Sequence, residues 1–167
     1  MQALADGRDG PDRTPHADQI AVTSRRSAAL SDTRAVPDLN VLGSQLESCS
    51  TDPLTGFYRD GCCTSGPEDL GSHTICAVVT AEFLEHQQSI GNDLSTPMPA
   101  YGFPGLVPGD RWCVTAANWL RAHHDGAAAY VVLKSTHARA LEVVPIEALT
   151  EHAVDVPADA GTITDGE

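Results

Sequence analysis

Four of the five cysteines lie in one turn-rich stretch between Asn40 and Cys76, together with His73. Thiolates and imidazoles are the ligands that zinc and other soft divalent metals prefer. The first hypothesis is therefore a binding protein for zinc or another soft divalent metal. Two features weigh against it: no Cys-x2-Cys pair occurs, and His73 and Cys76 would point to opposite faces of a strand. The candidate metal ligands are Cys49, Cys62, Cys63, Cys76 and Cys113.

The same residues also suggest nucleophilic chemistry. Cys62 follows Arg59, Asp60 and Gly61, and a guanidinium near a thiol would stabilise the thiolate. A cysteine nucleophile also needs a base, for which histidine is suited. The second hypothesis is an enzyme, and its candidate catalytic residues are Cys62, Cys63, His73 and His137. In the alternative without chemistry, the thiols are small buried apolar groups.

Polar residues in the predicted turns extend the candidate site. The turn carboxylates have an ordinary alternative role, since Asp and Asn side chains often cap turns and helices. If they instead line a pocket beside the thiols, they would bind an unidentified small molecule. The candidate substrate-binding residues are Arg59, Asp60, Asn92, Asp93, Arg111 and Trp112.

These residues must be positioned by a small set of elements. Residues 40–76 hold so many turn formers that tight turns with short extended pieces are expected. Apolar and β-branched residues predict strands at 73–79, 130–134 and 140–144. Capping residues and apolar periodicity predict helices at 81–90, 111–124 and 145–153. Residues 91–109 contain four prolines and four glycines, so they form a long irregular connection.

The fold class predicted is α+β, as one compact domain with a turn-rich N-terminal half and a short mixed or antiparallel sheet. Two to three helices complete it. Residues 1–36 lack apolar periodicity and are expected to be a disordered or loosely held extension. The core domain spans 38–154, and residues 155–167 form an acidic tail that is expected to be frayed.

Charge and composition exclude several partners. The 23 acidic residues outnumber ten Lys and Arg, which gives a net charge of -13. Phosphate backbones and anionic membranes are bound through clustered Lys and Arg, so neither nucleic acid nor membrane is an expected partner. Neither a secretory signal nor a membrane-spanning run is recognisable, so we expect a cytoplasmic protein with reduced thiols.

Several motifs occur in a fixed order and carry a resemblance to a known family. These strings, which lie between Asn40 and Pro145, are NVLGSQLESCSTDPLTGFYRDGCCTSGPEDLGSHTIC, GNDLSTP, FPGLVPGDRWC and THARALEVVP, and the resemblance extends over about Asn40 to Ala153. In these motifs the chain resembles the DUF2237 family, small proteins found mainly in bacteria and without an assigned activity. The resemblance implies a shared fold and supplies no function. Family members often read Arg-Trp-Cys-x-Cys where this chain has Thr115, so a thiol is missing here.

A third hypothesis involves no active site. A surface around Tyr101, Phe103 and Trp112 could contact a protein partner or a second copy of the chain. The sequence also lacks Gly-x-Gly-x-x-Gly, the phosphate-binding Gly-x4-Gly-Lys motif, His-Glu-x2-His and Gly-x-Ser-x-Gly. Dinucleotide oxidoreductases, nucleotide kinases, metalloproteases of that type and α/β hydrolases are therefore not expected.

Overall fold

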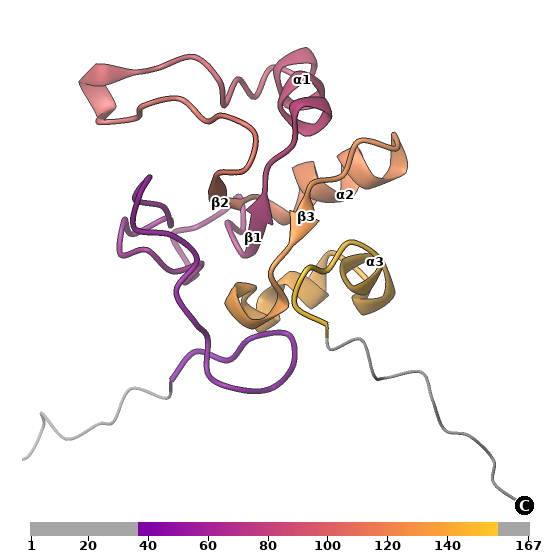
Figure 1. Ribbon diagram of the computed structural model, residues 1–167. Coiled ribbons are helices and arrows are strands. Elements are labelled where there is room, and N and C mark those ends of the chain that lie inside the picture. Colours follow the sequence, from indigo (N-terminus) through magenta and orange to yellow (C-terminus); the bar gives the residue numbers. More distant parts are fainter. Residues whose placement is uncertain (1–36, 157–167) are drawn as a thin grey trace, which may run out of the picture. The chain divides into compact units, whose positions relative to one another are not determined.

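The computed structural model describes residues 37–156, which form an α+β domain around a three-stranded antiparallel sheet. The predicted extension at 1–36 and residues 157–167 of the predicted tail lie outside these residues. The strands are β1 (Ile75–Val78), β2 (Arg111–Val114) and β3 (Tyr130–Val131), in the order β2-β1-β3. Figure 1 shows β1 at the centre of this sheet. The predicted fold class is confirmed.

Alternation along the strands gives the sheet two chemically different faces. Ile75 and Ala77 of β1 stand opposite Val114 and Trp112 of β2, and all four are buried in the main apolar core. Trp119 of α2 (Ala116–His124) is fully buried in this core too. The other face carries Cys76 and Cys113, which form a second buried cluster.

Helix α1 (Ala81–Ser89) forms where the sequence predicts it. The Thr80 hydroxyl accepts a hydrogen bond from the Phe83 N–H at 3.1 Å, which satisfies one of the free donors of the first turn. Gly91 follows the helix with φ +86°, a conformation that glycine adopts without strain. The helix buries Phe83 and Leu84. Helix α3 (Ile146–Glu151) also lies within its predicted range.

Residues 111–114 form a strand, so the prediction of one helix from Arg111 to His124 is wrong at its start. This segment pairs with β1 over four residues, and helix α2 begins only after Thr115. The apolar periodicity behind that prediction placed Cys113, Ala116, Ala117 and Leu120 on one buried helix face, but Cys113 belongs to the strand. The helix actually buries Ala116, Trp119 and Ala122, whereas Ala117 is exposed.

The C-terminal part contains less strand than predicted. Strand β3 has two residues and is followed by the short 3-10 helix η2 (Leu133–Ser135). The predicted strand at 140–144 is wrong, because residues 138–142 form the 3-10 helix η3 (Ala138–Glu142). Asp155, where the frayed tail was predicted to begin, accepts backbone hydrogen bonds from Leu133 and Lys134 at 2.8 and 2.9 Å.

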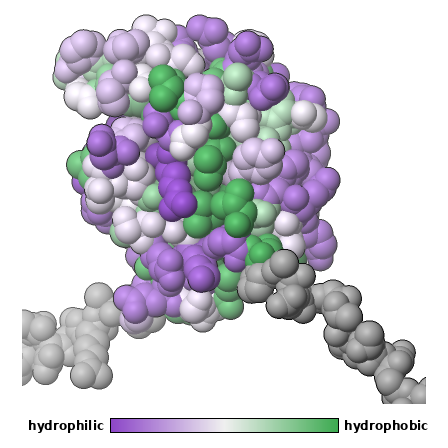
Figure 2. All heavy atoms as spheres, viewed as in Figure 1, coloured by the Kyte–Doolittle hydropathy of each residue, from purple (hydrophilic) through white to green (hydrophobic). Residues whose placement is uncertain are grey.

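The long connection between α1 and β2 is irregular apart from one 3-10 turn, η1 (Pro99–Tyr101). It extends away from the sheet and carries η1 at its far end (Figure 1). On the face shown in Figure 2, apolar residues form a band that reaches the surface between hydrophilic residues. None of the helices within residues 37–156 has the length and apolar character needed to cross a bilayer.

Candidate functional site

Four cysteines meet on the sheet face that points away from the main core, and they form two disulfides. Cys76 and Cys113 are direct neighbours across β1 and β2. Cys49 is bonded to Cys76, and Cys63 to Cys113. All four side chains are buried, from 0 to 4% exposed, and they pack together against Val132. We call these four residues the disulfide cluster. The expectation of reduced thiols is wrong.

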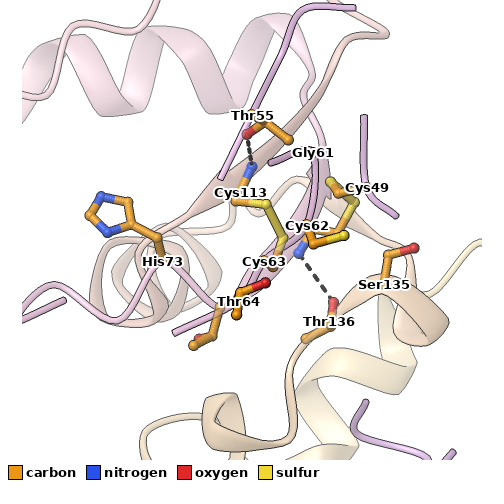
Figure 3. Close-up of a disulfide and its surroundings, with 12 residues drawn as sticks. Cys49, Thr55, Gly61, Cys62, Cys63, Thr64, His73, Cys113, Ser135 and Thr136 are labelled. Carbon is orange, nitrogen blue, oxygen red and sulfur yellow. Dashed lines mark hydrogen bonds between the residues drawn. A yellow bond between two sulfur atoms is a disulfide. The ribbon is translucent and has the colours of Figure 1, made fainter. Parts of the chain in front are cut away.

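Backbone geometry explains why these cysteines converge. The N–H of Cys113 points outward from β2 and donates to the Thr55 hydroxyl at 2.8 Å, and the N–H of Cys76 donates to the Thr136 hydroxyl at 3.2 Å (Figure 3). A cross-strand pair whose N–H groups point away from each other brings its side chains closest. The disulfides therefore attach the turn-rich segment to the sheet face.

Cys62 lies outside the disulfide cluster and is the one free cysteine of the described residues. Partial burial and the nearby Asp60 carboxylate raise the pKa of its thiol above the ordinary value. The sequence suggested the opposite, a thiolate stabilised by Arg59. Among residues 37–156, neither His73 nor His137 is hydrogen-bonded to Cys62, and in Figure 3 the His73 ring points away from the cysteines.

His137 serves the local fold. Its Nδ1 accepts the Arg139 N–H at 3.0 Å, which caps η3. Its Nε2 lies 3.3 Å from Asp38 but lacks the alignment of a hydrogen bond, and the side chain is only 8% exposed. His137 is therefore a buried residue that caps a 3-10 helix, and it does not share an environment with the other candidate catalytic residues.

A pocket of about 450 Å³ adjoins the disulfide cluster through Cys113. Its walls come from the turn-rich segment, the residue His73 just before β1, the long connection and β2. Most of its lining is aromatic or aliphatic, which is typical of small-molecule sites. The pocket, which we call the aromatic pocket, is lined by Gly56, Phe57, Arg59, His73, Asp93, Leu94, Met98, Tyr101, Phe103, Trp112 and Cys113.

His73 in this pocket is oriented by a buried carboxylate. Asp69 Oδ1 lies 2.6 Å from His73 Nδ1, and Asp69 Oδ2 accepts the His73 backbone N–H at 2.7 Å. Burial alone would raise the pKa of Asp69, but the hydrogen bonds from His73 outweigh it, and the pKa lies below its ordinary value. The ionised carboxylate fixes the Nδ1–H tautomer, so Nε2 is left available to act as an acceptor or base.

Arg59 brings a second polar group to the pocket. Its guanidinium lies 4.9 Å from the centre of the Trp112 ring, a cation–π contact. Its backbone has φ +54°, which is uncommon for a residue with a side chain and occurs often at functional sites. Phe103 packs on the same tryptophan, with ring centres 5.2 Å apart.

Asp93 lines the pocket but is already engaged. Its carboxylate accepts hydrogen bonds from the Ser95 and Thr96 backbone N–H groups and from the Thr96 hydroxyl. The Thr96 hydroxyl is the largest cause of its low pKa of about 2, followed by the two backbone donors. The capping role that the sequence offered as an alternative is thus present. Asn92 donates to Gln87 and borders a smaller adjoining cavity of about 50 Å³.

The remaining candidate binding residues lie outside the aromatic pocket. Asp60 accepts the Cys62 N–H at 2.9 Å and stabilises its turn, while Arg111 is an exposed residue at the start of β2. Of the predicted partner surface, Tyr101 is 75% exposed at the pocket rim, whereas Trp112 is 8% exposed. The sequence analysis missed Asp69 and Phe57. The spacing of Asp69 and His73, four residues apart, was an available but weak signal.

Fold and site together define a small α+β domain with a disulfide-stapled sheet and a ligand-sized pocket. A family model for uncharacterised proteins conserved in bacteria, DUF2237, matches residues 39–153. The chain belongs to this family, as its motifs suggested. Comparison with curated proteins gives no match.

Proposed function

We propose that this protein binds a small organic molecule with a flat apolar body and an acidic group, in the aromatic pocket. The observation that carries the proposal is the pocket itself: about 450 Å³, with aromatic walls and two basic side chains. Pockets of this size and lining are the ordinary sites of small ligands. The flat body would pack among Phe57, Phe103 and Trp112.

The charges in the pocket support an acidic group on the ligand. Asp93 is ionised, but its carboxylate already accepts three hydrogen bonds within its own turn. The Arg59 guanidinium packs on Trp112, and its hydrogen bond within the described residues is a long one of 3.5 Å to the Leu54 carbonyl. The Arg59 guanidinium can therefore offer its N–H groups to a carboxylate. His73 Nε2 adds a group that can accept a hydrogen bond or a proton. A chemical step on the ligand would use His73 as the acid or base.

Tryptophan fluorescence tests this proposal, because Trp112 lines the pocket. Aromatic carboxylates such as benzoate and 4-hydroxybenzoate should bind, and benzamide, which has the same shape without the charge, should bind at least about tenfold more weakly. Arg59→Gln should remove the difference. Arg111→Gln is the matched control, because Arg111 is exposed outside the pocket. Equal binding of acid and amide, or an equal effect of the two substitutions, would contradict the proposal.

A second candidate is a soft metal ion held by the reduced cysteines. It is favoured by the convergence of the Cys49, Cys63 and Cys76 sulfur atoms, which lie within 4.8 Å of one another. Cys113, bonded to Cys63, would complete a four-thiolate set of the type that zinc prefers. Cys62 is not part of it. Reduced protein titrated with Co²⁺ should then show thiolate charge-transfer absorption that Cys49→Ser abolishes and Cys62→Ser leaves unchanged.

A cysteine nucleophile has less support. Cys63 is fully buried in a disulfide, and the pKa of the Cys62 thiol is raised. A cytoplasmic location stays a prediction: disulfides are typical of oxidising compartments, although complete burial would also protect them from cytoplasmic reductants. A protein partner or homo-oligomer also stays a prediction, with Tyr101 as its most exposed aromatic residue.

A further inference from the structure

A pair of histidines lies between the C-terminal ends of α2 and α3, in a region that the proposed function does not use. His123 belongs to the last turn of α2, and His152 follows α3 directly. Nδ1 of His123 and Nε2 of His152 are 3.1 Å apart. The carboxylate of Glu151 joins them, and the three ligand atoms lie within 4.8 Å of one another. We propose that His123, His152 and Glu151 bind a divalent transition metal ion.

The separation of the two nitrogens fits chelation. Two imidazole nitrogens on one zinc ion, each about 2.0–2.1 Å from the metal in tetrahedral geometry, lie roughly 3.3 Å apart. The observed separation of 3.1 Å is close to that value. Two imidazoles and one carboxylate form the donor set of open zinc sites, and nickel and copper accept the same donors. The remaining coordination positions would be filled by water.

The surrounding structure fixes both rings before any metal arrives. The His123 ring stacks on Trp119, with an interplanar angle of 7° and ring centres 5.5 Å apart. The His152 ring meets the same tryptophan edge-on at 5.6 Å. Trp119 is fully buried and donates its indole N–H to the Ala129 carbonyl at 3.1 Å. The backbone carbonyl of His152 accepts the Val131 N–H of β3 at 2.9 Å. Preorganised ligands lose little entropy on binding.

Accessibility and charge also favour a cation here. Glu151 is exposed and both histidines are half-buried, so an ion can reach the site. The chain carries a net charge of -13, which raises the local concentration of cations. The alternative is that the two imidazoles only form a hydrogen bond with each other, and titration with metal distinguishes this alternative from a metal site.

The experiment is calorimetric titration of tag-free, non-reduced protein with Zn²⁺, repeated with Ni²⁺ while Trp119 fluorescence is recorded. With the disulfides intact, the four bonded cysteines cannot compete for the metal, and the titration is repeated on Cys62→Ser to exclude the free thiol. We expect one ion per chain and quenching by Ni²⁺, because the ligating His123 ring is stacked on Trp119. His152→Gln should weaken binding at least about tenfold, since even changes outside the ligand set cost about 10- to 100-fold.

Two further variants keep the test decisive. Glu151→Gln changes an exposed side chain, so the fold is not at risk, and it should weaken binding several-fold. His124→Gln alters the neighbouring histidine of the same helix end and should leave the affinity within a factor of two. Absence of saturable binding to the unmodified protein would overturn the proposal. So would an equal loss of affinity in His124→Gln and His152→Gln.

Discussion

Removal of the Cys63–Cys113 disulfide should destabilise the domain strongly, and the size of this loss of stability follows from the length of the loop that the bond closes. The bond closes a loop of 50 residues. Constraining a loop of that length lowers the entropy of the unfolded chain by an amount equivalent to about 4 kcal/mol of stability. Domains of this size have unfolding free energies of about 5–15 kcal/mol. The loss is therefore a large share of the total, and the melting temperature should fall by about 10–20 °C.

The assay is chemical and thermal unfolding of the double variant Cys63→Ala/Cys113→Ala against the parent protein, both non-reduced. Cys62→Ala is the matched control, since it deletes the adjacent cysteine, which is unpaired. Reduced parent protein keeps all the sulfur atoms but lacks both disulfides, so it gives the combined effect of the two bonds without a loss of buried sulfur volume. An unchanged unfolding free energy in the double variant, or an equal loss in Cys62→Ala, would refute the reasoning.

Four other substitutions test the scaffold around the site. Asn40→Ala should lower the free energy of unfolding by about 2–3 kcal/mol, because this side chain is 1% exposed and forms hydrogen bonds with five backbone or side-chain groups. Urea unfolding measures this change, and a loss under about 0.5 kcal/mol would contradict the role of the hydrogen-bond network. Asp69→Asn should make the stability of the domain less dependent on acid pH. A carboxyl whose pKa is lowered in the folded state stabilises the fold above its unfolded pKa of about 3.9, and it loses this contribution as the pH falls through the folded pKa. Unfolding curves of the variant and the parent between about pH 2 and 5 should therefore differ. Gly56→Ala should lower the free energy of unfolding by at least about 2 kcal/mol, and Gly43→Ala should lower it by about 1 kcal/mol. Both glycines have positive φ, but only at Gly56 would the added Cβ clash with a backbone carbonyl. Equal melting temperatures of the two variants would argue against that clash.

Local chemistry made part of this fold predictable. The Thr80 cap and Gly91 enclose α1, and both signals act within a few residues of the helix that they delimit. The irregular connection followed from its prolines and glycines. Family motifs spanned the whole core, so the family could be identified from the sequence as well.

Long-range pairing made the rest unpredictable. The segment 111–114 is a strand because it pairs with β1 and because Cys113 is bonded to Cys63, and neither partner is visible in its own residues. The disulfide pairing is equally hidden, since five cysteines leave many connectivities open. The aromatic pocket needs four segments to meet. The polar or aromatic character of three pocket residues was visible in the sequence: Arg59, Asp93 and Trp112. The neighbours that each of them contacts are defined only by the three-dimensional structure.

The two faces of the sheet are held by unlike forces, which gives the domain two different modes of failure. Heat or urea acts on the apolar side, where Ile75, Trp119 and their neighbours are packed. A strong reductant acts on the opposite side, where covalent bonds replace a second packed layer. A strong reductant in the absence of heat or urea should therefore detach the segment that bears Phe57 and Arg59 while the helices stay folded. A bound ligand would be released before the protein unfolds.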